Sequence, residues 1–281
     1  MPAAPARTTQ DGPHRVTVLG SFTLTAHGAT IPLGVDARRL VAYLAVHPRP
    51  QRRGALAADL WPGMAVGAAM RLLDDAVLAV AVPGLLVTDD RGALALGADV
   101  EVDLTAAMQL VRTLPDVAAD ARPDLSLLAA DILPGWTAAW IVVERERFRQ
   151  LRLHAIEERS VRLTAAVRID EAVALARSAV RSAPSRDSAR RVLIEALLAQ
   201  GDIAGAVAEY DEYQELLRSS VGAAPAFSLD GLLLPTPAWP VMRARSVMPR
   251  SAVQLPGLRS VRASGTGRRL VAGGSLPGSA R

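Results

Sequence analysis

The side chains that could carry out catalysis or bind a metal are few in this sequence of 281 residues. It contains no Cys, which excludes disulfides, thiolate metal sites and cysteine nucleophiles together. The four histidines, His14, His27, His47 and His154, stand at no ligand spacing such as i, i+4, so an imidazole metal site is not expected. Neither a Walker loop nor a Gly-x-Ser-x-Gly elbow occurs. The sequence therefore predicts no enzyme, no cofactor and no metal.

Arginine is the remaining side chain with strong binding chemistry. All 32 basic residues are Arg, which indicates a GC-rich genome more than selection for bidentate anion recognition. The segment 235–281 holds eight Arg and no acidic residue, whereas the whole chain has a formal net charge of only +4. The preceding residues therefore carry a net charge of about −4, and the part of the chain expected to fold is not basic.

The two ends of the chain are predicted to be flexible. Residues 1–14 are small, polar and proline-bearing, without the apolar run that a secretory signal requires. The Arg-rich tail, residues 234–281, is rich in Pro, Gly and Ser and cannot build a packed core, so we expect disorder there. It either adds non-specific nucleic-acid affinity or has no function. Apolar stretches such as 138–143 are too short to span a bilayer, so the sequence predicts a cytoplasmic protein without membrane contact.

Between residues 15 and 104 the hydrophobic pattern predicts short strands and three helices. Apolar and polar residues alternate over 15–33, which is typical of antiparallel strands. Helical spacing follows, and the chain ends this region with a β-hairpin over 85–96. The predicted helices cover residues 36–46, 53–61 and 67–82. This order is that of an α+β winged helix-turn-helix domain with an additional N-terminal sheet.

From Val102 to Leu233 the pattern is almost wholly helical. A long helix is expected over 135–166, with an apolar stripe and a charged face that we interpret as solvated. A repeat of 34 residues follows, the period of tetratricopeptide helix pairs. The matching positions are Leu163, Ala165, Ile169, Ala172 and Val173 with Leu197, Ala199, Ile203, Ala206 and Val207. We therefore predict a second domain over 105–233, all-α and tetratricopeptide-like.

Several motifs in this order resemble the Streptomyces antibiotic regulatory protein (SARP) family. The resemblance covers about residues 15–230 and is most specific in the segment from Leu133-Pro-Gly-Trp136 to Trp140 and in Glu144-Arg-Glu-Arg-Phe-Arg-Gln-Leu-Arg152. Members of the family join a winged helix of the OmpR/PhoB response-regulator type to a bacterial transcriptional activation domain (BTAD). The resemblance implies a DNA-binding transcriptional activator without enzyme activity. The implied partners are double-stranded promoter DNA, RNA polymerase and a second copy of the chain.

The candidate DNA-binding residues that the resemblance implies are Arg52, Arg53, Arg71 and Arg91. The helix over 67–82, in the recognition position, carries Arg71 as its only cation and also Asp74 and Asp75. Residues 14–104 hold eight Arg and nine acidic residues, so no basic footprint marks a DNA-binding surface. A second hypothesis therefore stands beside the first: a divergent member whose winged helix has lost base reading and binds a protein partner.

Overall fold

The computed structural model describes residues 14–233, so the Arg-rich tail and most of the N-terminal segment lie outside the described residues. A four-stranded sheet opens the described chain, in the order β3-β2-β1-β6. Strands β1, β2 and β3 are antiparallel neighbours, and β6 returns to pair parallel with β1. The strands are β1 (Arg15–Thr17), β2 (Thr23–Ala26), β3 (Ala29–Thr30) and β6 (Glu101–Val102). The expected turn between β2 and β3 is present, with His27 and Gly28 both at positive φ.

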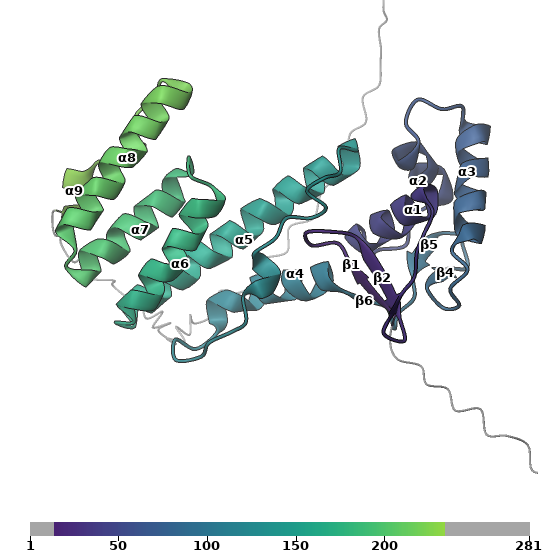
Figure 1. Ribbon diagram of the computed structural model, residues 1–281, viewed down its shortest axis with the longest axis horizontal. Helices are drawn as coiled ribbons and strands as arrows, with labels where there is room; N and C mark the ends of the chain where they lie inside the picture. The colour runs from purple at the N-terminus through teal and green to yellow at the C-terminus, as the bar shows by residue number, and fades with distance from the viewer. Residues whose placement is uncertain (1–13, 234–281) are drawn as a thin grey trace, which may run out of the picture. The chain divides into compact units, whose positions relative to one another are not determined.

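Three helices and a hairpin lie between β3 and β6 (Figure 1). They are α1 (Val35–Val46), α2 (Arg53–Leu60), α3 (Val66–Ala79), β4 (Leu86–Thr88) and β5 (Leu94–Leu96). Helix α1 is apolar on nearly every side because it separates two cores. Its Val41 and Ala45 pack toward the sheet, and its Leu40 and Leu44 pack toward α2, α3 and β5. The architecture is a winged helix that follows an N-terminal sheet along the chain, as the sequence predicts.

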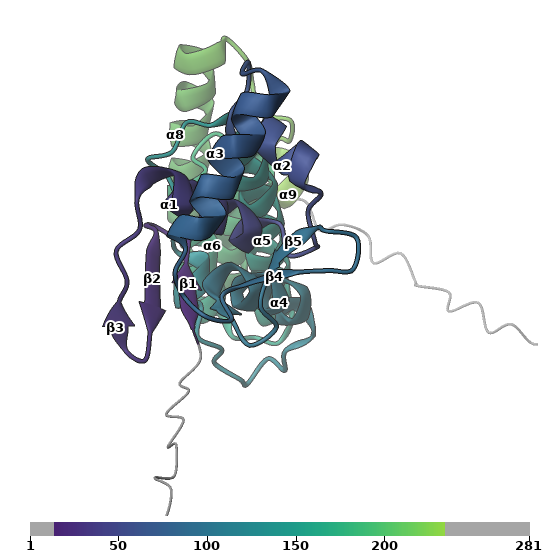
Figure 2. The same cartoon turned by 90° about the vertical axis from the view of Figure 1, so that its right-hand side faces the viewer.

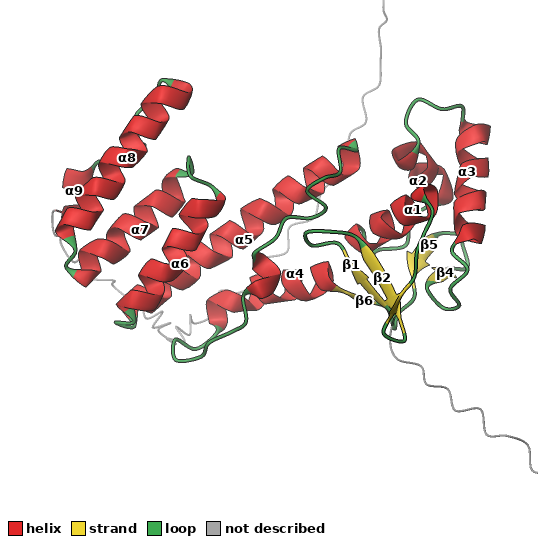
Figure 3. Ribbon diagram, in the orientation of Figure 1, coloured by secondary structure: helices red, strands yellow, loops and turns green. Residues whose placement is uncertain are grey.

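The remaining described residues are helical or lie in loops (Figure 3). They form α4 (Asp103–Thr113), η1 (Leu114–Asp116), η2 (Ser126–Leu128), α5 (Ala139–Ala165), α6 (Ile169–Ser182), α7 (Asp187–Gln200), α8 (Ile203–Val221) and α9 (Leu229–Leu233). Helices α5 to α8 pack in sequence order, each against the next. Most of their buried apolar side chains belong to the same core as the sheet, since one cluster of buried residues includes both Val16 of β1 and Ala206 of α8.

Three predicted helices are shorter than the sequence pattern indicates, although α2 is so by one residue only, because it ends at Leu60 and not at Trp61. Helix α3 ends at Ala79 and not at Val82, because Val82 precedes Pro83 and a residue before proline is disfavoured in helical conformation. Helix α5 begins at Ala139 and not at Gly135, since residues 133–136 form a turn closed by a 2.9 Å bond from the Trp136 amide to the Leu133 carbonyl. Leu133 itself has a positive φ of 42°.

The 34-residue repeat places equivalent residues in equivalent positions of two helix pairs. Ala172 in α6 and Ala206 in α8 are both fully buried. The turns that precede these helices also correspond, because Val167 (φ +61°) and Gly201 (φ +83°) are 34 residues apart and both left-handed. Gly201 adopts the left-handed conformation without strain, whereas Val167, a β-branched residue, adopts it at a cost in free energy.

Exchanging the two turn residues should change stability in opposite directions. Gly201→Val should lower the free energy of unfolding by about 1 to 2 kcal/mol, the cost of a left-handed residue with a Cβ. Val167→Gly should raise it by less, since relief of strain is partly offset by the greater freedom of glycine in the unfolded chain. The Val167 side chain is 81% exposed, so its removal loses little packing. Urea denaturation measures both; destabilisation by Val167→Gly would contradict the strain argument.

Candidate nucleic-acid interface

Helices α2 and α3 form the helix-turn-helix of this domain. Ala69, Leu73 and Ala76 bury the inner face of α3 against α1 and α2. The opposite face of α3 is open, and it faces the viewer in Figure 2 with the β4–β5 hairpin beside it. An exposed helix next to an exposed hairpin is the geometry with which winged helices contact a DNA groove and its flanking backbone.

The structure separates the four predicted arginines into two kinds. Arg53, at the start of α2, forms an ion pair with Asp74 of α3 and so neutralises one of the two carboxylates on that helix. Arg52, Arg71 and Arg91 are exposed, and no carboxylate among residues 14–233 forms an ion pair with them. Three of the predicted cations are therefore available to an anionic partner, and one holds α2 and α3 together.

Backbone pairing brings two of these three arginines into one region. Gln51 and Leu94 exchange backbone hydrogen bonds of 2.7 and 2.8 Å, which attach the hairpin to the residue preceding Arg52. At the hairpin tip, Asp89 Oδ1 accepts hydrogen bonds from the amides of Arg91 (2.9 Å) and Ala93 (2.8 Å). The tip that carries Arg91 is thus a closed, hydrogen-bonded turn fixed to the start of α2.

A partly buried polar contact supports these helices. The Tyr43 hydroxyl of α1 donates a 2.6 Å hydrogen bond to Asp59 Oδ2 of α2. Burial raises the pKa of Tyr43, and the neighbouring Asp59 carboxylate raises it further, so the phenol stays protonated and remains a donor. This bond joins the end of α2 to α1 and adds to the apolar core between the two helices.

The exposed face of α3 is less basic than a DNA-reading helix usually is. Asp75 is exposed beside Arg71, and Val66 and Leu78 are 78% and 79% exposed. Apolar side chains this exposed at both ends of one helix favour a protein contact over a groove lined with phosphates. The structure therefore keeps both hypotheses from the sequence.

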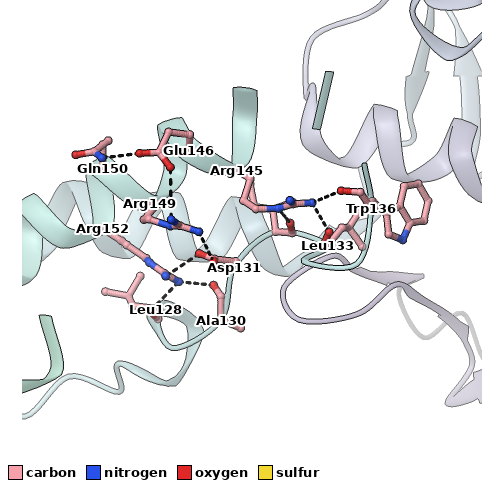
Figure 4. Close-up of polar contacts among 11 residues, drawn as sticks. Leu128, Ala130, Asp131, Leu133, Trp136, Arg145, Glu146, Arg149, Gln150 and Arg152 are labelled. Atoms are coloured by element: carbon pink, nitrogen blue, oxygen red, sulfur yellow. Dashed lines mark hydrogen bonds and ion pairs between the residues drawn. The ribbon is translucent and has the colours of Figure 1, made fainter. Parts of the chain in front are cut away.

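A row of arginines on α5 holds the loop that precedes this helix (Figure 4). Arg145 donates to the carbonyls of Ile132 (2.7 Å), Leu133 and Trp136 (2.7 Å). Farther along the helix, Arg152 donates to the carbonyls of Leu128 (3.3 Å) and Ala130 (2.6 Å).

Asp131 adds a charge to this arrangement. It accepts a 2.9 Å hydrogen bond from Arg149, and its Oδ1 forms an ion pair with Arg152 Nη2 at 2.7 Å. The hydrogen bond to Asp131 raises the pKa of Arg149, whereas burial lowers the pKa of Arg152. The charged face of α5, which the sequence predicts to be solvated, is solvated only in part. Glu146 and Arg147 are exposed, but Arg149 binds Asp131 of the loop.

The loop held by these arginines also contacts the winged helix. The Leu133 amide donates to the Val18 carbonyl (2.9 Å), and the Gly20 amide donates to the Asp131 carbonyl (2.8 Å). Trp136 packs against Phe22 with ring centroids 6.4 Å apart. Because one loop is bonded to α5 on one side and to the N-terminal sheet on the other, it ties the helical region to the winged helix.

Among residues 14–233, no three His, Asp or Glu side chains gather as a metal site would. Over the same residues, no helix is both long and apolar enough to cross a lipid bilayer.

Comparison with known proteins identifies the helical region. Residues 102–232 match the family model of the bacterial transcriptional activator domain. The regulatory protein AfsR of Streptomyces coelicolor is 30% identical over 248 residues, which are 82% of this chain and 25% of AfsR. The chain thus spans a quarter of the length of that relative. A solved structure, Mycobacterium tuberculosis EmbR in complex with a low affinity phosphopeptide, aligns with a TM-score of 0.49 at 17% identity, covering 78% of this chain and 63% of that one.

The activator-domain match begins where the sequence pattern turns helical, and the similarity to AfsR covers 82% of the chain and so extends beyond that domain; both findings agree with the resemblance seen in the sequence. The chain carries a bacterial transcriptional activator domain at residues 102–232 and is similar over 82% of its length to a regulatory protein of Streptomyces coelicolor.

Proposed function

We propose that this protein is a transcriptional regulator that binds promoter DNA through its winged helix and activates transcription through its helical domain. The observation that carries the proposal is the exposed α3 beside a rigid hairpin, with Arg52, Arg71 and Arg91 free of carboxylate partners within residues 14–233. A family of transcription regulators has no need of catalytic residues, which fits the absence of catalytic motifs in the sequence.

Each arginine has a distinct role in this proposal. Arg71, midway along α3, contacts base edges in the major groove, where a guanidinium can bind guanine with two hydrogen bonds. Arg52 and Arg91 flank α3 and contact the phosphates on either side. Arg53 acts on the protein itself, because its ion pair with Asp74 reduces the repulsion between α3 and the DNA backbone. In this arrangement the second helix of the helix-turn-helix lies in the major groove, as in other helix-turn-helix proteins.

The helical domain is the proposed surface for RNA polymerase or for a second copy of the chain. We propose that α5 to α8 form tetratricopeptide-like pairs, supported by the 34-residue spacing of Ala172 and Ala206 and of the turns at Val167 and Gly201. Repeats of this kind bury a continuous core by stacking and leave a curved face for a partner.

A second candidate function is a protein-interaction module without DNA binding. The exposed Val66 and Leu78 on α3 favour it, as does the carboxylate of Asp75 on the same helix. In this case the winged helix would dock a protein through an apolar contact and modulate another regulator.

DNA binding at two salt concentrations separates the two candidates. We expect the full chain to bind duplex DNA, and Arg52→Gln/Arg91→Gln to weaken binding and reduce the salt slope by about 2, roughly one per lost phosphate contact. Fluorescence anisotropy of labelled random-sequence DNA provides the measurement. Arg177→Gln/Arg181→Gln, on exposed positions of α6, removes the same charge from the helical domain and serves as the matched control.

Equal salt slopes for the two double variants would show that the winged-helix arginines contact no phosphate. That result would support the interaction module, and Leu78→Asp should then abolish binding of a protein partner without changing DNA affinity.

A further inference from the structure

A cavity of about 440 Å³ lies where the winged helix meets the activator domain. Its walls come from the end of α1 and the loop that follows it, from α4, and from the first half of α5. The volume falls within the usual range of small-molecule sites, about 300 to 1,000 Å³. Neither the proposed DNA contacts nor the arginines that hold the 128–136 loop account for it, because none of those side chains lines the cavity.

The floor of this cavity is apolar. Val46, Leu104, Ile132 and Phe148 line it and are themselves nearly fully buried, with exposed fractions of 7% or less. Leu151 extends the apolar wall toward solvent and is 37% exposed. A ligand seated here would therefore bury an apolar body against side chains that are already fixed by core packing.

The rim of the cavity is cationic. Arg49 from the loop after α1, Arg112 from α4 and Arg147 from α5 line it, together with one carboxylate, Glu144. Glu144 lies 3.7 Å from Arg147, whose side chain is 70% exposed. The guanidinium groups of Arg49 and Arg112 form no ion pair or hydrogen bond with any of residues 14–233, and both residues are exposed. The rim thus presents two uncompensated guanidinium groups from two different parts of the fold.

We infer that this cavity binds a small organic anion, a carboxylate, sulfonate or phosphate with a compact apolar body. Guanidinium groups bind such anions with paired, charge-assisted hydrogen bonds, and the apolar floor accounts for the rest of the molecule. The charge also disfavours the chain's own segment 235–281 as the occupant, because every charged side chain in that segment is Arg. Since the walls come from both the winged helix and the activator domain, the ligand touches both at once.

The binding of two naphthalene probes tests this site on the full chain. The anionic probe is 8-anilinonaphthalene-1-sulfonate, and the neutral one is N-phenyl-1-naphthylamine, which has the same rings without the sulfonate. We expect saturable one-to-one binding of the sulfonate and at least about tenfold weaker binding of the neutral probe, the factor that corresponds to about 1.4 kcal/mol. The bound sulfonate should also raise the melting temperature in proportion to its saturation.

Variants locate the site. Arg49→Gln/Arg112→Gln should weaken sulfonate binding by about tenfold or more, because both charge-assisted contacts are lost. Arg177→Gln/Arg181→Gln removes the same charge from α6 and should leave the affinity unchanged. Leu151→Glu, which adds a carboxylate at an exposed wall position, should weaken the sulfonate more than the neutral probe; it decides the question if the Arg double variant does not fold. Equal affinity for the two probes, or sulfonate binding that neither the Arg double variant nor Leu151→Glu changes, would overturn the inference.

Discussion

Replacing Trp61 by Ala should lower the free energy of unfolding by about 3 to 5 kcal/mol, the range for deleting a large buried aromatic side chain. Trp61 follows the last residue of α2, is only 7% exposed, and belongs to the core between α1, α2, α3 and β5. Its indole also donates a 3.2 Å hydrogen bond from Nε1 to Asp36 Oδ1. Its removal would leave a cavity beneath the helix-turn-helix.

Trp61→Phe separates the two contributions. It keeps most of the buried ring and loses the bond to Asp36, so a loss of about 1 kcal/mol from that bond is expected on top of a smaller packing loss. Urea denaturation followed by far-ultraviolet circular dichroism measures both variants. A melting temperature for Trp61→Ala equal to that of the unaltered chain would show that Trp61 contributes nothing to the core.

Replacing Asp131 by Asn should destabilise the protein by about 3 kcal/mol, because it leaves the buried guanidinium of Arg152 without its counter-charge. The Arg152 side chain is 5% exposed, and Asp131 is the one carboxylate within residues 14–233 that forms an ion pair with it. The carbonyls of Leu128 and Ala130 still accept hydrogen bonds from Arg152, which keeps the loss at the lower end of the range for broken buried pairs.

Adding Arg152→Met to Asp131→Asn should recover part of the lost stability, since no buried charge then remains without a partner. The exposed pair Arg191–Glu195 on α7 is the matched control, and Glu195→Gln there should cost less than about 1 kcal/mol. If Asp131→Asn and Glu195→Gln had equal effects, the Arg152–Asp131 pair would behave as a surface ion pair and not as a buried one.

The fold was predictable from hydrophobic periodicity because each core position recurs at a spacing that depends only on local geometry. The alternation around Val16 and Leu24 gives β1 and β2, and the three-to-four spacing of Leu40 and Leu44 gives α1. Helix ends were less predictable. Val80 and Val82 continue the apolar pattern of α3, yet they leave the helix before Pro83, since packing positions and helical conformation are set by different constraints.

The sequence indicated which arginines belong to the candidate site, but not which carboxylates they contact in the fold. Nothing in the local sequence connects Arg53 with Asp74, which are 21 residues apart and meet only because α2 packs on α3. The cavity rim is a stronger case, because Arg49, Arg112 and Arg147 come from three separate elements. Long-range proximity of this kind follows from the tertiary fold, so it could not be derived from spacing along the chain.

The spacing of the arginines on α5 indicates that they could bind a loop. Arg145, Arg149 and Arg152 recur at spacings of four and three, so they occupy one face of the helix, next to the buried Phe148. Arginines beside the buried stripe of a helix can face solvent or can bind a loop that covers the helix. The sequence allows both, and the structure shows that residues 128–136 form the covering loop.

The forked hydrogen bonding of Arg159 limits how this chain can evolve. Its guanidinium donates to the carbonyls of Val117, Ala118 (2.9 Å) and Ala121 (3.0 Å) while the residue is only 2% exposed. A lysine ammonium lacks this planar fork, so a codon change to Lys would leave carbonyl groups of the loop without a donor. Exposed positions such as Arg177 carry no such restriction. Lysine should therefore be tolerated in place of arginine at exposed positions such as Arg177 but not at Arg159, where the planar fork closes the loop.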